Sequence, residues 1–262
     1  MNDYYLCLYI KTMKEILLNI PKRTQKPRNK GLTMMMDKGL SINQAQDFLE
    51  VNKEYTDIIK LGFGTSIITP NISEKIKLYQ KNGIIVYAGG TLFEAFAIRN
   101  QIQDYKKYLR KIGIKMVEIS DGTININHQK KCDIISEFTK EFTVVSEVGN
   151  KSIENKISVS EWIKQIKEEL IAGSWKVIAE ARESGNIGIF ENNGNIKSDL
   201  ISEIIKSVND SDIIWEAPKK QQQAWFINKL GSNVNLGNIS ADEVTGLECL
   251  RIGLRGDTFN IQ

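Results

Sequence analysis

Met116-Val117-Glu118-Ile119-Ser120-Asp121-Gly122 is a short apolar run that ends in charged and small residues. Seven similar runs occur along the chain, at residues 33–36, 58–59, 84–87, 142–145, 175–178, 213–215 and 233–236. Segments long enough to form helices separate the runs, and alternating strands and helices are typical of a parallel sheet. Eight such units predict an α/β fold, namely a single (β/α)8 TIM barrel. Such a barrel gathers the polar residues that follow its strands at one mouth.

The segments between the runs carry apolar residues at spacings of three and four, which indicates amphipathic helices. We expect helices over residues 42–55, 71–83, 93–112, 158–172, 200–208, 221–230 and 241–252. No linker or repeat divides the chain, so we predict one catalytic barrel domain over residues 27–262, preceded by an N-terminal extension, residues 1–26. The basic stretch at residues 21–30 is typical of a solvated lead-in; the alternative is contact with an anionic substrate above the barrel mouth.

Composition limits the possible partners. The chain has 262 residues, 41% hydrophobic, with a net charge of +3. This charge is too weak to support nucleic-acid or membrane binding through bulk electrostatics, and no apolar run is long enough to span a bilayer. The three cysteines form no CxxC pair, which favours a reducing cytoplasm.

Carboxylates are the most numerous candidates for chemistry. Acidic residues lie at or just after predicted strand ends, at Asp37, Glu118, Asp121, Glu147, Glu180, Glu183 and Glu216. Crowded carboxylates repel one another unless a cation intervenes, and a set of oxygen ligands favours Mg²⁺. We therefore predict a Mg²⁺ site formed by members of the set Asp37, Glu118, Asp121 and Glu147. The alternative is that some of these carboxylates pair with Lys or Arg inside the barrel.

Basic residues near strand ends are candidates for binding anions. Lys60 ends a buried strand, where an ammonium needs a partner, so it is a candidate proton donor or anion clamp, or else part of a structural ion pair. Charge and position make Lys38, Arg182, Asn235 and Arg255 candidate substrate-binding residues, the last two near a phosphate. The only histidine, His128, lies in a polar stretch beyond a strand end and is predicted to be on the surface.

The ordered set of motifs resembles the phosphosulfolactate synthase family. Residues that carry the resemblance are Thr33–Leu40, Lys60–Ser66, Gly89–Glu94, Val117–Thr123, Ser146–Gly149, Glu180–Gly185, Glu216–Pro218 and Gly253–Phe259. They run from about residue 27 to residue 259, which is nearly the whole chain.

The resemblance implies a Mg²⁺-dependent TIM-barrel lyase that adds sulfite to phosphoenolpyruvate and yields phosphosulfolactate. It places the proton donor at Lys151, which would protonate an enediolate-type intermediate. It also implies a place in coenzyme M biosynthesis or in sulfolactate formation. We expect a cytoplasmic homo-oligomer that binds small anionic substrates.

Two other functions remain open from the sequence. The first is a different Mg²⁺-assisted lyase or aldolase on the same barrel, with another nucleophile. The second is a non-catalytic, stress-associated relative, which the loss of charges at the strand ends would favour.

Overall fold

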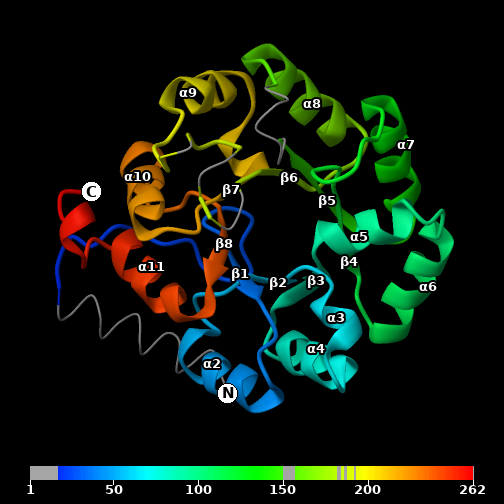
Figure 1. Ribbon diagram of the computed structural model, residues 1–262. Coiled ribbons are helices and arrows are strands. Elements are labelled where there is room, and N and C mark those ends of the chain that lie inside the picture. The colour runs from blue at the N-terminus through cyan, green and yellow to red at the C-terminus, as the bar shows by residue number, and fades with distance from the viewer. Residues whose placement is uncertain (1–16, 150–156, 182–183, 186–187, 192, 262) are drawn as a thin grey trace.

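The strands close into a barrel. The computed structural model describes residues 17–149, 157–181, 184–185, 188–191 and 193–261. Within these ranges the strands pair in parallel in the order β1 to β8, and β8 pairs with β1. The predicted TIM barrel is therefore confirmed (Figure 1). The strands are β1 (Thr33–Asp37), β2 (Ile58–Leu61), β3 (Ile85–Ala88), β4 (Met116–Ile119), β5 (Thr143–Val148), β6 (Lys176–Ala179), β7 (Ile213–Glu216) and β8 (Leu236–Ser240).

Helices form a ring around the barrel (Figure 1). They are α2 (Ile42–Asn52), α3 (Thr65–Ile68), α4 (Ile72–Lys81), α5 (Gly90–Ala97), α6 (Ile102–Ile112), α7 (His128–Phe138), α8 (Val159–Ile171), α9 (Ser198–Ser207), α10 (Lys220–Leu230) and α11 (Val244–Arg251).

Three helical segments differ from the sequence prediction, and one of them is the short α3, which was not expected. The single helix expected over residues 93–112 is interrupted between α5 and α6, where Asn100 has a left-handed backbone with φ of 55°. Helix α7 was not predicted, because its first residues are polar and its apolar face is short. Asn127 caps it by accepting hydrogen bonds from the backbone of the first turn.

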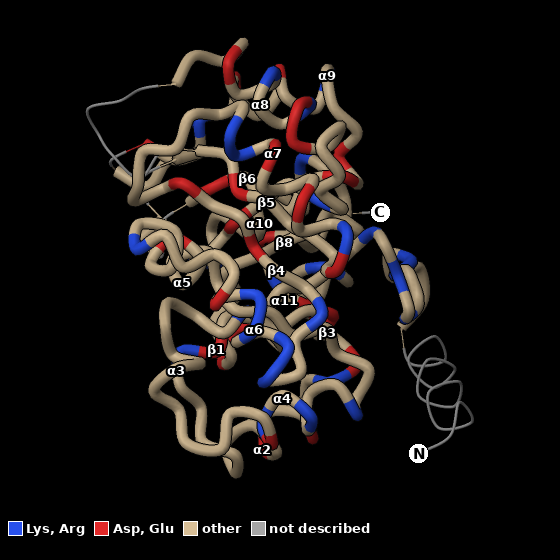
Figure 2. The backbone as a smooth tube through the Cα atoms, turned by 90° about the vertical axis from the view of Figure 1, so that its right-hand side faces the viewer, with Lys and Arg blue, Asp and Glu red and all other residues tan. Residues whose placement is uncertain are grey.

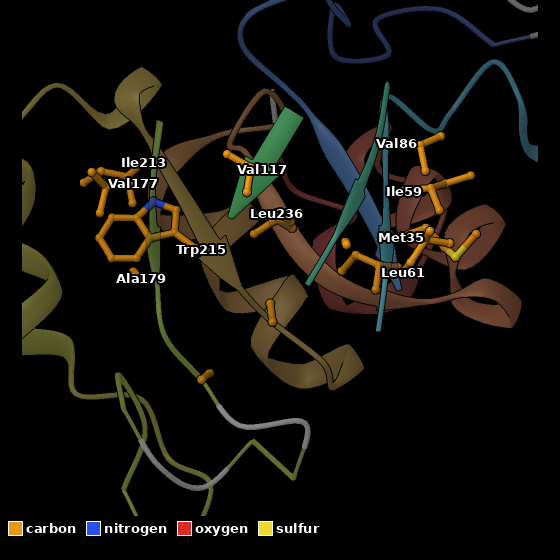
Figure 3. Close-up of a cluster of buried hydrophobic side chains, with 14 of the residues drawn as sticks. Met35, Ile59, Leu61, Val86, Val117, Val177, Ala179, Ile213, Trp215 and Leu236 are labelled. Carbon is orange, nitrogen blue, oxygen red and sulfur yellow. The ribbon is translucent and has the colours of Figure 1, made fainter. Parts of the chain in front are cut away.

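Alternation along the strands sorts side chains into two groups. Outward residues such as Met35, Val117 and Trp215 pack beneath the helices (Figure 3). Inward residues form a separate apolar layer inside the barrel, made of Leu32, Met34, Ile58, Tyr87, Met116, Val145, Ile178 and Ile214. Because the period of a strand is two, the residue two positions after each inward residue also points inward, nearer the C-terminal mouth.

The N-terminal lead-in closes the opposite end of the barrel. The Arg23 guanidinium pairs with Glu248 at 2.9 Å, and Lys26 donates to the carbonyl oxygens of Lys53 and Thr56. Arg28 pairs with the buried Asp57, which precedes β2, at 2.9 Å. Arg23, Lys26 and Arg28 are therefore not solvated and do not lie above the C-terminal mouth, because they bind groups at the N-terminal ends of the strands, whereas Lys22 and Lys30 are exposed.

The surface shows no dominant charge. Lys and Arg segments are interspersed with Asp and Glu segments along the outer helices (Figure 2). Within the described residues, no helix has both the length and the apolar composition that a membrane span requires.

Removal of Arg28 tests whether the lead-in is part of the folded barrel. Arg28→Met would leave the Asp57 carboxylate buried without its partner, which destabilises a protein by about 3–5 kcal/mol. We expect a loss of free energy of unfolding in this range, measured by urea denaturation. Arg110→Met is the control, because the Arg110–Glu141 pair is exposed and should contribute little. Equal stability of the two variants would contradict an anchoring role for the lead-in.

Candidate active site

A cavity of about 340 Å³ opens at the C-terminal ends of the strands. Its lining combines acidic groups with one lysine, and includes both inward strand residues and the loops that follow. The lining residues are Met36, Lys60, Phe63, Gly89, Thr91, Thr123, Glu147, Glu180, Ala181, Ser184, Glu216 and Asn238. This is the mouth at which the sequence predicted catalytic groups.

Lys60 lies at the centre of this cavity's charges. Its Nζ is 3.0 Å from Glu118 Oε2, 3.3 Å from Glu216 Oε1 and 3.8 Å from Glu147 Oε2. Burial alone would lower the pKa of Lys60, but the carboxylates of Glu118 and Glu216 outweigh it and hold that pKa well above its ordinary value. The side chain therefore stays an ammonium at neutral pH, as the ion-pair alternative expects.

Three buried carboxylates are close enough to share a cation. One oxygen from each of Glu147, Glu180 and Glu216 lies within 4.8 Å of the others. Burial raises the pKa of Glu216 to about 7, although Lys60 opposes the shift. Oxygen-only ligands with this much negative charge suit Mg²⁺ or Mn²⁺, so the residues present fit a divalent cation.

Glu118 is held by the start of α5 as well as by Lys60. The Gly90 N–H donates to Glu118 Oε1 at 2.7 Å, and a Cβ at Gly90 would collide with Glu118 and Ser120. The buried Glu94 accepts hydrogen bonds from the Ser120 hydroxyl and from the backbone and hydroxyl of Thr123. Helix α5 thus fixes both the Glu118 carboxylate and the loop after β4. Glu118, a predicted metal ligand, contacts Lys60 but is not part of the three-carboxylate cluster.

Asp121 does not line the cavity and belongs to a second group of charges, formed with Lys131 and Glu169. It pairs with Lys131 of α7 at 2.8 Å, and Lys131 also contacts Glu169 at 2.7 Å and donates to the Glu147 carbonyl oxygen at 2.6 Å. This geometry does not support Asp121 as a metal ligand, but it ties the end of β5 to two helices.

Asp37 also lies outside the pocket, which corrects the expectation that it binds metal there. Met36 lines the cavity, so the next residue on β1 points outward to the helices. There Asp37 Oδ2 pairs with Lys75 at 2.8 Å and accepts from the Tyr79 hydroxyl at 2.9 Å, while Oδ1 accepts from the backbone of Gly39 and Leu40. Both carboxylate oxygens of Asp37 therefore have partners within the protein.

Two predicted substrate-binding residues lie away from the mouth. Asn235 precedes β8, because that strand begins three residues later than expected, and its amide bonds the backbone of Leu32, Ser211 and Ile213 at the N-terminal end of the barrel. Arg255 follows α11, donates to the Gly246 carbonyl oxygen at 3.5 Å and does not line the cavity. Both positions argue against phosphate binding in this cavity.

The other predicted residues have simpler outcomes. Lys38 is exposed on the loop after β1, at the mouth end of the barrel. Lys151 and Arg182 lie outside the described residues. His128 is partly exposed at the start of α7, 3.1 Å from Glu168 Oε2.

The predicted metal ligands include only part of the carboxylate cluster in the cavity. Of the predicted metal set, Glu147 belongs to the three-carboxylate cluster, while Glu180 and Glu216 were named as strand-end acids but not chosen. Alternation could have selected them, because each follows an inward isoleucine, Ile178 or Ile214, by two residues. Asn238 was missed, and no simple pattern marks it.

Comparisons with known proteins agree on one family. The family model described as "(2R)-phospho-3-sulfolactate synthase (ComA)" matches residues 21–257. The chain is 41% identical to the phosphosulfolactate synthase of Methanothermobacter thermautotrophicus, over 91% of this chain and 95% of that protein. It is 39% identical to the phosphosulfolactate synthase of Bacillus subtilis, over 94% of this chain and 99% of that protein.

A solved structure supports the fold alone. The 3-hexulose-6-phosphate synthase of Salmonella typhimurium superposes with a TM-score of 0.54 at 14% identity, covering 86% of this chain and 100% of that chain.

The raised pKa of Glu216 predicts a pH-dependent cost to the metal-free protein. A carboxyl whose pKa rises from 4.5 to about 7 on folding binds its proton more tightly in the folded state. Its contribution is therefore most favourable below pH 4.5 and declines as the pH rises to about 7. Glu216→Gln should raise the free energy of unfolding at pH 8 by up to about 3 kcal/mol, and this advantage should shrink towards pH 4.5.

Urea denaturation of parent and variant between pH 5 and pH 8 measures this difference. The exposed Glu203→Gln is the control and should give a constant difference from the parent over the same range. A pH-independent effect of Glu216→Gln would show that this carboxyl ionises normally.

Proposed function

This chain belongs to the (2R)-phospho-3-sulfolactate synthase family, an enzyme family, and we propose that it catalyses the Mg²⁺-dependent addition of sulfite to phosphoenolpyruvate. One observation carries the proposal beyond the family name. Four buried carboxylates lie near the mouth, those of Glu118, Glu147, Glu180 and Glu216. Among the described residues, Lys60 is the ammonium that contacts them. The described part of this mouth carries more negative than positive charge, and a bound cation would offset it.

Glu147, Glu180 and Glu216 are the residues that would hold Mg²⁺. A bound Mg²⁺ would offset the negative charge that builds on the substrate carboxylate as sulfite adds. Lys60 would keep these carboxylates at their positions without neutralising all of them, since it bears one charge. In the metal-free protein the neighbouring carboxylates, Glu118 and Glu216 first, hold the pKa of Lys60 above its ordinary value. We retain Lys60 as a second candidate catalytic residue.

The reaction needs one proton donor beside the reacting carbon. The sulfite sulfur would attack the terminal methylene carbon of phosphoenolpyruvate, and the alkene electron pair would move towards the carboxylate. A proton would then add to the carbon that bears the phosphate. We assign this proton to Lys151, as the resemblance implies.

The neighbourhood of Gly149 supports this assignment. A Cβ on Gly149 would meet the Glu180 Cβ at 2.5 Å, so only glycine lets the end of β5 pass beside the carboxylate cluster. Lys151 follows two residues later in the sequence.

Binding of the anionic groups would use other cations at this end of the barrel. We retain Lys38, on the loop after β1, and Arg182, which directly follows the pocket residue Ala181 in the sequence. We extend the proposal to a cytoplasmic homo-oligomer, in which the free thiols of Cys132 and Cys249 stay reduced, and to a product used for coenzyme M or sulfolactate.

Incubation of the purified protein with phosphoenolpyruvate, sulfite and Mg²⁺ tests the reaction. We expect phosphosulfolactate, detected by ³¹P NMR, and loss of activity on treatment with a chelator. Lys151→Ala should lower kcat by about 10²–10⁴-fold, the usual contribution of a positioned general acid. Lys164→Ala, on the exposed face of α8, is the control and should retain parental activity.

Three outcomes would redirect the proposal. Product formed only with another small nucleophile would favour a different lyase or aldolase. No turnover with any nucleophile would favour a non-catalytic relative. Full activity of Lys151→Ala would remove the proton-transfer assignment while leaving the reaction in place.

A further inference from the structure

Strand β8 contains one more residue than its pairing with β1 requires. Leu236 pairs with Thr33, but Ile239 pairs with Met35, so three steps on β8 match two on β1. The additional residue lies at Gly237-Asn238, where Asn238 has a left-handed backbone with φ of 57°. This is a β-bulge, a device that changes the direction of a side chain near many active sites.

The bulge turns Asn238 into the barrel. Gly237 points inward, because a Cβ there would collide with Met34 and Ile214 of the inner layer. Alternation would then direct Asn238 outward and Ile239 inward. Instead Ile239 packs in the outer core and Asn238 lines the cavity.

The Asn238 side chain is buried, and its two polar atoms, Nδ2 and Oδ1, differ in their hydrogen bonding. It is 7% exposed, and its Nδ2 donates to the Ala181 carbonyl oxygen at 3.1 Å. Because that oxygen can only accept, the amide nitrogen must face it, and Oδ1 must face the other way. Among the described residues, Asn238 Oδ1 has no hydrogen-bond partner.

Ala181 links this amide to the carboxylate cluster. Its N–H donates to Glu216 Oε2 at 2.8 Å, and its carbonyl oxygen accepts from Asn238. The residue before it, Glu180, is itself a member of the cluster. Asn238 is therefore fixed beside the same carboxylates with an unpaired acceptor, in a cavity that they share.

The chemistry of the unpaired atom limits its ligand. A carbonyl oxygen repels the oxygens of phosphate, carboxylate and sulfite, which are themselves acceptors or anions. It binds a cation, or it accepts a hydrogen bond from water bound to that cation. An unpaired buried acceptor is energetically unfavourable, and it points to an ion or a water at that atom.

We propose that Asn238 Oδ1 is a further oxygen donor to a divalent-cation site formed by Glu147, Glu180 and Glu216, directly or through a cation-bound water. The inference rests on the proposed function for the choice of metal, but it does not depend on the reaction. The β8 bulge would then bring a neutral oxygen to a site whose other protein ligands are all carboxylates.

Two variants separate the acceptor from the rest of the residue. Asn238→Gly keeps a left-handed backbone without strain and removes the side chain. Asn238→Asp tolerates the same backbone and keeps an acceptor oxygen, but it loses the bond to Ala181. We expect Asn238→Gly to bind Mn²⁺ about tenfold more weakly than the parent, and Asn238→Asp to bind it at least as tightly.

Electron paramagnetic resonance of free Mn²⁺, titrated into the metal-free full-length protein, measures the affinity without any substrate. Circular dichroism melting confirms that both variants fold. Equal weakening in both variants would overturn the proposal in favour of a role through the bond to Ala181 alone. Unchanged affinity in Asn238→Gly, or no Mn²⁺ binding by the parent, would also overturn it.

The parent protein separates this inference from the proposed function. If it binds Mn²⁺ with the expected dependence on Asn238 but forms no product from phosphoenolpyruvate and sulfite, the reaction is wrong and the metal ligand stands. If product forms and the Asn238 variants bind Mn²⁺ as the parent does, the reaction stands and the ligand is wrong.

Discussion

The pocket depends on one buried ammonium among carboxylates. Lys60 lies within 4 Å of three of them, and all of these side chains are buried. Charges taken out of water are tolerated only when opposite charges and hydrogen bonds replace the lost solvation. Among the described residues, Lys60 is one positive charge facing several carboxylates; burial, and after it the neighbouring Glu147 carboxylate, raises the pKa of Glu216. A divalent cation held by Glu147, Glu180 and Glu216 would offset much of the negative charge of the described groups.

Strand geometry explains why these charges meet. The lower inward layer is apolar and supplies Ile58, Met116, Val145, Ile178 and Ile214. Two residues further on, the same strands supply Lys60, Glu118, Glu147, Glu180 and Glu216. A dry layer therefore lies directly below a charged one, which lowers the local dielectric constant and strengthens each ion pair. Closure of the barrel is thus what turns scattered residues into one site.

The sequence predicted the barrel well because eight apolar runs ending in polar residues are a repeated, redundant signal. It predicted the site less well, because strand-end position places a residue at the mouth but does not say which way it points. Asp37 failed on direction, and Asn235 failed because β8 begins later than its apolar run suggests. Asp121 lies at the C-terminal end of the barrel, as expected, but it pairs with Lys131 of α7 and not with the pocket residues. Such partners come from helices, whose side-chain directions the strand-end pattern does not predict.

Asn238 shows where alternation itself stops being a guide. If the same residues of β8 alternated regularly without the bulge, Ile239 would point inward and an isoleucine would replace the amide beside the carboxylates. An apolar group there would raise the cost of the buried charge and give nothing to a cation. The bulge lets β8 pair with β1 through Leu236 and Ile239 while Asn238 faces the cavity. Barrel closure and pocket chemistry therefore place different demands on the same strand, and one additional residue satisfies both.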